Sequence, residues 1–127
     1  MAQVCYSIFA GMINIYGIKN CDVVQKALKW LDAHKVPYTF HNYKETGLDK
    51  ALLEQWLKHI AVDKLVNTRS TTFRELGEEE KAGWNDKNKA IALMMQHTSV
   101  VKRPVWDLGN GNYLLGWDEQ ALTKALL

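Results

Sequence analysis

The sequence predicts an α/β protein with a mixed four-stranded sheet. Short apolar runs typical of strands alternate with amphipathic stretches typical of helices. The first two predicted strands flank one helix, which favours parallel pairing, whereas an Asn-Gly pair joins the last two and favours an antiparallel hairpin. At 127 residues and 47% hydrophobic, the chain is suited to one core.

The first predicted unit is strand, helix, strand. Residues Ile13 to Gly17 read as a strand, and Tyr38 to Tyr43 as the next. Between them a helix ends near His34-Lys35, before Pro37; its apolar face consists of Val24, Ala27, Leu28 and Leu31. Connections this short make a right-handed unit with parallel strands.

The middle of the chain is predicted to be an inserted helical segment. After Gly47, Asp49 is a candidate N-cap for a helix whose apolar stripe is Leu53, Trp56, Leu57 and Ile60. The polar stretch Asn67 to Asn85 follows, and its acidic run Glu78 to Glu80 is expected to be solvated. Another helix runs from Asp86 to about His97, with an inner face of Ala90, Leu93 and Met94, broadened by Ile91 and Met95.

The last third returns to strands. Residues Val100 to Trp106 and Asn112 to Leu115 are predicted to pair through the turn Gly109-Asn110-Gly111. A final helix starts at Asp118, with Leu122, Ala125 and Leu126 facing inward. The element order is that of a thioredoxin-like sheet, βαβ, inserted helical segment, ββα, with helices on both faces.

Charge, cysteine content and the N-terminus limit the classes of function. Sixteen basic against 14 acidic residues give a net charge of +2, too balanced to predict nucleic-acid or membrane binding. Residues 1–11 form an upstream extension, expected to be poorly ordered, and residues 12–127 form the domain. With only Cys5 and Cys21, we expect free thiols in a reducing cytoplasm. Cys5 is a candidate resolving thiol, although an incidental role is favoured. For a domain of this size we expect a monomer.

Cys21 is the strongest candidate for chemistry. It follows the break of the first strand at Gly17 and stands where the first helix begins. The free N–H groups and positive dipole end of a helix stabilise a thiolate, and Lys19 is expected to add to this effect. Asp22 opposes it, so a moderate net lowering of the thiol pKa is predicted.

Four motifs stand out along the chain: Tyr16-Gly17-Ile18-Lys19-Asn20-Cys21, Asn67-Thr68-Arg69-Ser70, Lys102-Arg103-Pro104-Val105 and Leu115-Gly116-Trp117-Asp118-Glu119. They resemble the arsenate reductase-like family, which includes glutathione-dependent arsenate reductases, the RNA-polymerase-binding regulator Spx and YffB-type proteins. The resemblance runs from Met12 to the C-terminus and is closest to the YffB-type branch.

The resemblance implies a role for each matching residue. Cys21 corresponds to the catalytic cysteine that attacks an oxyanion, and glutathione resolves the adduct. Arg69 and Arg103 correspond to anion-binding arginines, which suit tetrahedral oxygens because a guanidinium stays charged and offers several donors. Pro104 corresponds to a cis-proline. Lys19 and Asn20 are further candidates for substrate binding, although they also suit a turn.

Three departures from the arsenate reductases weigh against arsenate as substrate. Asp22 places a negative charge beside the nucleophile, and Trp117 stands where the family has a third arginine. Val24 is three residues after Cys21, so there is no Cys-x-x-Cys and no internal disulfide at this site. A catalytic cycle would require an external thiol such as glutathione.

Two hypotheses remain open. In the first, the chain is a glutathione-dependent monothiol oxidoreductase acting on a small oxyanion or a thiol or disulfide substrate. In the second, it is a Spx-like regulator module that binds RNA polymerase without catalysis. Independently of these hypotheses, the alternative to a site role for Arg69 and Arg103 is that of surface ion-pair partners, for example of the acidic run. The four histidines show no metal-ligand spacing, so we expect no metal: His34, His41, His59 and His97.

Overall fold

The computed structural model describes residues 13–109 and 111–127, which form two compact units. The first unit contains the described residues up to Asn42 together with Arg103–Leu127, and the second is Tyr43–Lys102. The second unit therefore corresponds to the segment predicted as an insertion. The extension at residues 1–11, with Cys5, lies outside the described residues.

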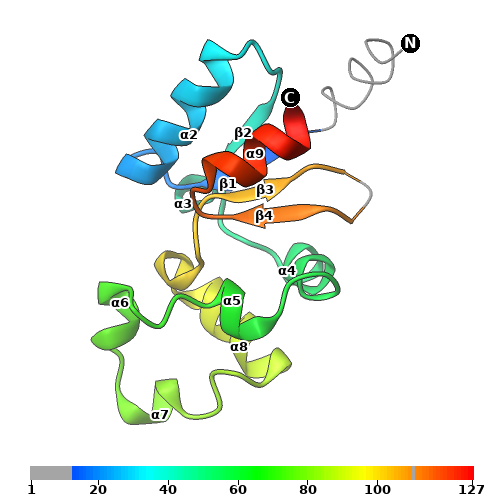
Figure 1. Cartoon of the computed structure of the whole chain (residues 1–127). Helices are drawn as coiled ribbons and strands as arrows, with labels where there is room; N and C mark the ends of the chain where they lie inside the picture. Colours follow the sequence, from blue (N-terminus) through cyan, green and yellow to red (C-terminus); the bar gives the residue numbers. More distant parts are fainter. Residues whose placement is uncertain (1–12, 110) are drawn as a thin grey trace. The chain divides into compact units, whose positions relative to one another are not determined.

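The first unit is a four-stranded mixed sheet with two helices (Figure 1). Its strands lie in the order β2-β1-β3-β4, with β1 parallel to β2 and antiparallel to β3, and β3 antiparallel to β4. The element bounds are β1 Asn14–Gly17, α2 Asp22–Ala33, β2 Thr39–Asn42, β3 Val105–Asp107, β4 Tyr113–Leu115 and α9 Glu119–Leu126. The predicted parallel unit and antiparallel hairpin are confirmed.

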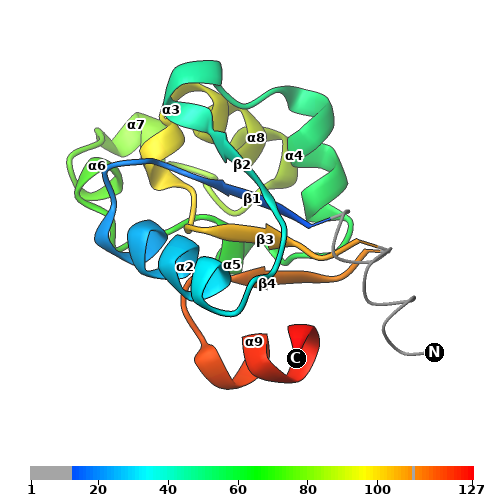
Figure 2. The same ribbon diagram turned by 90° about the horizontal axis from the view of Figure 1, so that it is seen from above.

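Both helices of this unit cover one face of the sheet, as Figure 2 shows. Strand side chains alternate, so Ile13 and Ile15 of the first strand segment point to the same face as Trp106, the ladder partner of Ile15. Against this face pack Ala27, Trp30 and Leu31 of α2 and Leu122 and Leu126 of α9. The indole N–H of buried Trp106 donates to the Gly116 carbonyl at 2.8 Å, so the core retains no unpaired group there.

The second unit is helical, and α4 packs against α8 in it. Its elements are α3 Tyr43–Thr46, α4 Lys50–Leu57, α5 Val62–Leu65, α6 Thr71–Arg74, α7 Glu78–Lys81, α8 Lys87–Gln96 and the 3-10 turn η1 Thr98–Val100. The predicted cap Asp49 accepts the Leu52 N–H at 2.7 Å, and Asp86 accepts that of Lys89 at 3.2 Å.

Two predicted strand boundaries are wrong. The strand expected from Val100 begins only at Val105, because Val100 ends η1 and Pro104 has no N–H for a ladder bond. Val101 makes only an isolated antiparallel bridge with Val66. Tyr43, expected to end β2, instead begins α3, because the partner strand ends at Gly17, opposite Asn42.

Two side chains expected to face inward are exposed. Met95 on α8 is 43% exposed, whereas the adjacent Met94 is fully buried, and Ala125 on α9 also faces solvent. The inward faces of both helices are therefore narrower than the hydrophobic pattern suggests. The polar stretch after Asn67 contains two short helices that were not predicted, α6 and α7, and α7 buries none of its residues.

Candidate active site around Cys21

Cys21 is the N-cap residue of α2. Its backbone is extended, with φ −121° and ψ 127°, while its carbonyl accepts the first helical hydrogen bond from the Gln25 N–H at 2.9 Å. The Gln25 side chain turns back and donates from Nε2 to the Lys19 carbonyl at 2.6 Å. This bond ties the turn between β1 and α2 to the first turn of the helix. The half-buried sulfur is thus held at a helix N-terminus.

The surroundings of Cys21 lower its pKa. Burial of the thiol by itself raises the pKa, but the Val24 N–H, the Arg103 side chain and the Val23 N–H together outweigh burial. These donors favour the thiolate, and the Cys21 side chain makes no capping hydrogen bond in the structure. Cys21 therefore has the chemistry of a nucleophile, because only the thiolate attacks efficiently. Lys19 and Asp22, expected to act in opposite directions, are not among the groups that shift this pKa.

Arg103 reaches Cys21 through the register of the sheet. β3 runs antiparallel to β1, with Val105 opposite Tyr16, so the segment that enters β3 lies beside the end of β1 from which the chain leads to Cys21. The Arg103–Pro104 peptide bond is cis, as the family resemblance implies. The Pro104 carbonyl accepts the Gly116 N–H at 2.9 Å, which joins this segment to the chain after β4. Two predicted site residues 82 positions apart are thus brought together.

The other candidates have different settings. Lys19 and Asn20 are exposed in the turn before α2. Arg69 lies in the second unit, where its N–H donates to the Asn67 side chain at 3.1 Å and its own side chain is exposed. Ser70, the next residue, caps α6 by accepting the Phe73 N–H at 3.1 Å. A role of Arg69 at the cysteine remains a prediction.

Trp117 packs within the first unit. Its ring meets Trp30 edge to face at 6.3 Å between centroids, and the Lys26 ammonium lies 5.0 Å from its centroid. The ring therefore joins α2 to the segment before α9.

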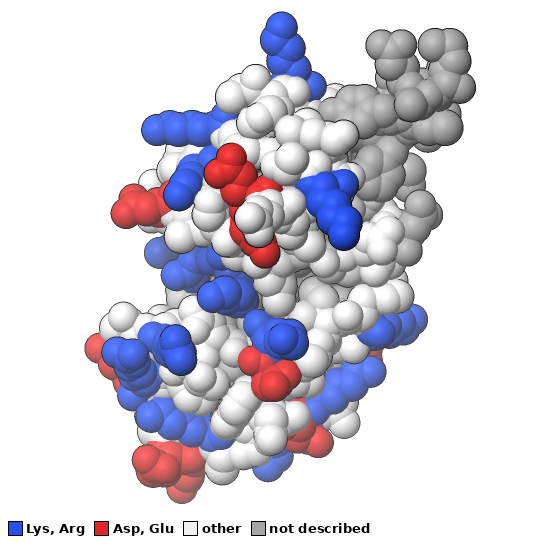
Figure 3. All heavy atoms as spheres, in the orientation of Figure 1, with Lys and Arg blue, Asp and Glu red and all other residues white. Residues whose placement is uncertain are grey.

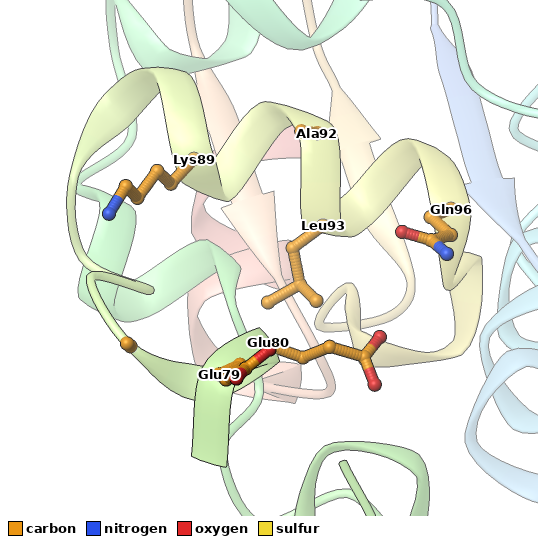
Figure 4. A pocket seen from close by; sticks show the side chains of 7 residues that line it. Glu79, Glu80, Lys89, Ala92, Leu93 and Gln96 are labelled. Carbon is orange, nitrogen blue, oxygen red and sulfur yellow. The ribbon is translucent and has the colours of Figure 1, made fainter. Parts of the chain in front are cut away.

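A separate pocket lies in the second unit between α7 and α8 (Figure 4). It has a volume of about 200 Å³ and is lined by residues that include Glu79, Glu80, Lys89 and Leu93. A hydrogen bond of 2.9 Å joins the Glu80 carboxylate to Nε2 of His97, so the partner seen for this carboxylate is a histidine. Neither Cys21 nor Arg103 lines the pocket.

The described residues contain no group of three or more His, Cys, Asp or Glu side chains that could hold a metal ion. Within the same residues, no helix is both long enough and apolar enough to cross a membrane. Basic and acidic side chains are interspersed over the face shown in Figure 3.

The ArsC family model matches residues 16–125, so the chain belongs to the ArsC family. The solved structure of a YFFB protein is 43% identical, with a TM-score of 0.86, over 91% of this chain and 100% of that one. An arsenate reductase (ArsC) related protein from Brucella melitensis is 40% identical, with a TM-score of 0.69, over 89% and 92% of the two chains. The global transcriptional regulator Spx of Streptococcus pneumoniae is 28% identical over 74% of this chain and 71% of its own.

These similarities confirm the predicted family, its YffB-type branch and the thioredoxin-like fold class. The family is related to arsenate reductases and includes regulators among its relatives.

Sequence reasoning missed two contributors to the site. The Gln25 bond to Lys19 had a signal, a long amide side chain in the first helical turn. The other is the close approach of α2 to Gly17, for which the glycine alone was a weak signal.

Proposed function

We propose that this protein is a glutathione-dependent monothiol oxidoreductase with Cys21 as its nucleophile. The observation that carries the proposal is the lowered pKa of Cys21, produced by the helix N–H groups and Arg103. Arg103, assisted by Arg69, would hold an anionic group of the substrate, since both are permanently charged. The reducing cytoplasm supplies the glutathione that such a cycle needs.

The proposed cycle has two thiol exchanges. The Cys21 thiolate attacks one sulfur of a disulfide, forming a mixed disulfide while the other sulfur leaves as a thiolate. A glutathione thiolate then attacks the mixed disulfide at the substrate-derived sulfur, and Cys21 leaves as the thiolate. When the sulfur bound to Cys21 comes from a glutathione mixed disulfide, this exchange consumes one glutathione thiol and releases glutathione disulfide, whose other half came from the substrate. With any other disulfide, a second glutathione thiolate attacks the mixed disulfide that is released, so two glutathione thiols are oxidised and the substrate disulfide gains two electrons. Val24 stands three residues after Cys21, so no Cys-x-x-Cys disulfide can form at this site, and in the proposed cycle glutathione supplies the second thiol.

Arsenate is a poor candidate substrate. Asp22 is exposed directly after the nucleophile, and its carboxylate repels an approaching oxyanion. Residue 117 is a tryptophan, so it supplies no guanidinium for an oxyanion. Its ring packs against Trp30 and Lys26 instead. We expect little or no arsenate turnover in an assay with glutathione and a coupled reductase.

The test is adduct formation with glutathione disulfide. The Cys5→Ser variant leaves Cys21 as the only thiol and should gain one glutathione by intact-mass spectrometry, an adduct that excess glutathione removes. The matched Cys21→Ser variant, which retains Cys5, should not gain glutathione at the rate at which Cys5→Ser does. If Cys5→Ser forms no adduct, Cys21 is not the nucleophile of a glutathione-dependent cycle.

The Spx relatives support a second candidate, a regulator module that binds RNA polymerase without catalysis. In that case purified RNA polymerase should retain the protein, and Cys21→Ser should bind equally well. A Cys21 thiol that titrates near its ordinary value of about 8.5 would favour this candidate over the enzyme. Absence of polymerase binding, together with a reversible glutathione adduct, would exclude it.

A further inference from the structure

Gly17, the last residue of β1, is a glycine because of the space around it. A Cβ placed on Gly17 would lie 2.8 Å from Cγ2 and 3.4 Å from Cγ1 of Val24, and 3.7 Å from a ring carbon of Phe40. The first distance is shorter than real Cβ contacts allow. Gly17 does not have a positive φ, so conformational freedom is not the reason for the glycine. The Val24 side chain occupies the space that a side chain at position 17 would need.

Val24 links this space to the cysteine. Its side chain is fully buried, so it has no free room to retreat from an added methyl group. Its N–H, in the first turn of α2, is one of the donors that act on the Cys21 thiolate. A shift of Val24 away from β1 would therefore move a donor that stabilises the nucleophile.

We propose that Gly17 is a positioning residue, whose missing side chain lets Val24 approach β1 and holds the Val24 N–H toward the Cys21 sulfur. This inference rests on the proposed function, because it concerns the same nucleophile. Gly17 itself touches no substrate; it acts only through the position of the Val24 side chain against β1.

The charged groups near Cys21 are not attached to this contact. Arg103 approaches from the segment before β3, whereas the Val23 N–H directly precedes Val24 in α2 and would move with it. Lys19 and Asp22 are exposed on either side of the cysteine. A substitution at Gly17 should consequently remove part of the stabilisation of the thiolate and leave the Arg103 part.

The experiment is the pH profile of iodoacetamide alkylation, measured in the Cys5→Ser background. Gly17→Ala should move the profile to higher pH and slow alkylation below the midpoint by roughly three- to tenfold, since one pKa unit corresponds to a tenfold change in thiolate. Val24→Ala removes the two methyl carbons that would clash but keeps the N–H, so it is the reference for the double variant. The Gly17→Ala/Val24→Ala double variant should recover most of the shift.

Gly77→Ala is the matched control, since a Cβ there has no neighbour within 4 Å. It should leave the profile unchanged. Should Gly17→Ala fail to fold, Val24→Ile overfills the same contact from the helix side and should shift the profile in the same direction. An unchanged profile in Gly17→Ala, or in Val24→Ile where Gly17→Ala does not fold, overturns the proposal. A double variant whose profile is shifted as far as that of Gly17→Ala also overturns it. The assay contains no glutathione, so a failed adduct test would contradict the proposed function without deciding this inference.

Discussion

At the scale of single residues, the ionisation of Cys21 depends on groups from two distant parts of the chain. The helix N–H groups follow it directly in sequence, whereas Arg103 arrives through the antiparallel pairing of β1 and β3. The first contribution is local and the second is tertiary. They can therefore be separated by mutation.

Replacing Arg103 should raise the pKa of Cys21. Arg103→Ala removes both the hydrogen bond and the positive charge, so alkylation at neutral pH should slow about three- to tenfold, and Arg103→Lys should lie between it and the wild type. The pH profile of iodoacetamide alkylation measures this effect. Arg74→Ala, which removes an exposed arginine in the second unit, controls for net charge. Equal profiles for Arg103→Ala and Arg74→Ala would mean that Arg103 does not act on the thiolate.

At the scale of elements, each long helix is defined by a cap at its start and by one buried face. Asp49, Asp86 and Asp118 each accept an N–H in the first turn of their helix. Among the described helices of eight residues or more, α2 is the exception, because the side chain of its N-cap residue Cys21 makes no capping bond. The cap position of α2 is thus occupied by the candidate nucleophile.

The buried face of α8 predicts different costs for two neighbouring methionines. Met94 is fully buried, and truncation to alanine should reduce the free energy of unfolding by about 2–5 kcal/mol. Met95 is 43% exposed, and Met95→Ala should change that free energy by less than about 0.5 kcal/mol. Urea unfolding of both variants measures the difference. Similar costs would show that α8 buries a wider face than the structure gives it.

The Asp118 cap of α9 makes a second prediction at this scale. Asp118→Ala leaves the Ala121 N–H without its acceptor and should cost about 1 kcal/mol of unfolding free energy. Asp118→Asn keeps an acceptor oxygen and should cost less. Thermal unfolding of the two variants checks this order, and an alanine variant as stable as the wild type would contradict it.

At the scale of the whole molecule, the lowered pKa of Cys21 links stability to pH. The unfolded thiol holds its proton up to about pH 8.5, whereas the folded thiol loses it at lower pH. Between the two values the unfolded state binds more protons, so stability rises with pH. This contribution is complete above the unfolded pKa and is lost as the pH falls through the folded pKa.

The difference in unfolding free energy between wild type and Cys21→Ser should follow this pH dependence. Relative to the serine variant, the wild type should gain stability as the pH rises toward about 8.5 and then level off. Urea unfolding with a reductant present, at a series of pH values, measures the difference. A difference that is constant with pH would mean that the folded and unfolded thiols share one pKa.

Features that depend on a few neighbouring residues were predicted well from sequence. Apolar periodicity located β1 and α2, and the cap Asp49 was identified because a capping oxygen acts within three residues. The position of Cys21 at a helix N-terminus is equally local. The pairing of Arg103 with Cys21 came from family resemblance, since no local pattern in the residues indicates which arginine reaches the site.

The sequence by itself determined the order of the strands and the longer helices, the parallel pair β1–β2, the antiparallel hairpin β3–β4 and the cysteine at the start of α2, because caps, turns and hydrophobic periodicity act over a few residues. Only the tertiary structure decided that Met94 is buried while Met95 is not, that β3 begins after Pro104, and that Arg103 and the Val24 N–H both act on the Cys21 sulfur. These outcomes depend on which surfaces meet and how closely. One example is the close approach of Val24 to Gly17, where an added Cβ would lie 2.8 Å from Cγ2 of Val24. This approach exists only once β1 and α2 have packed together.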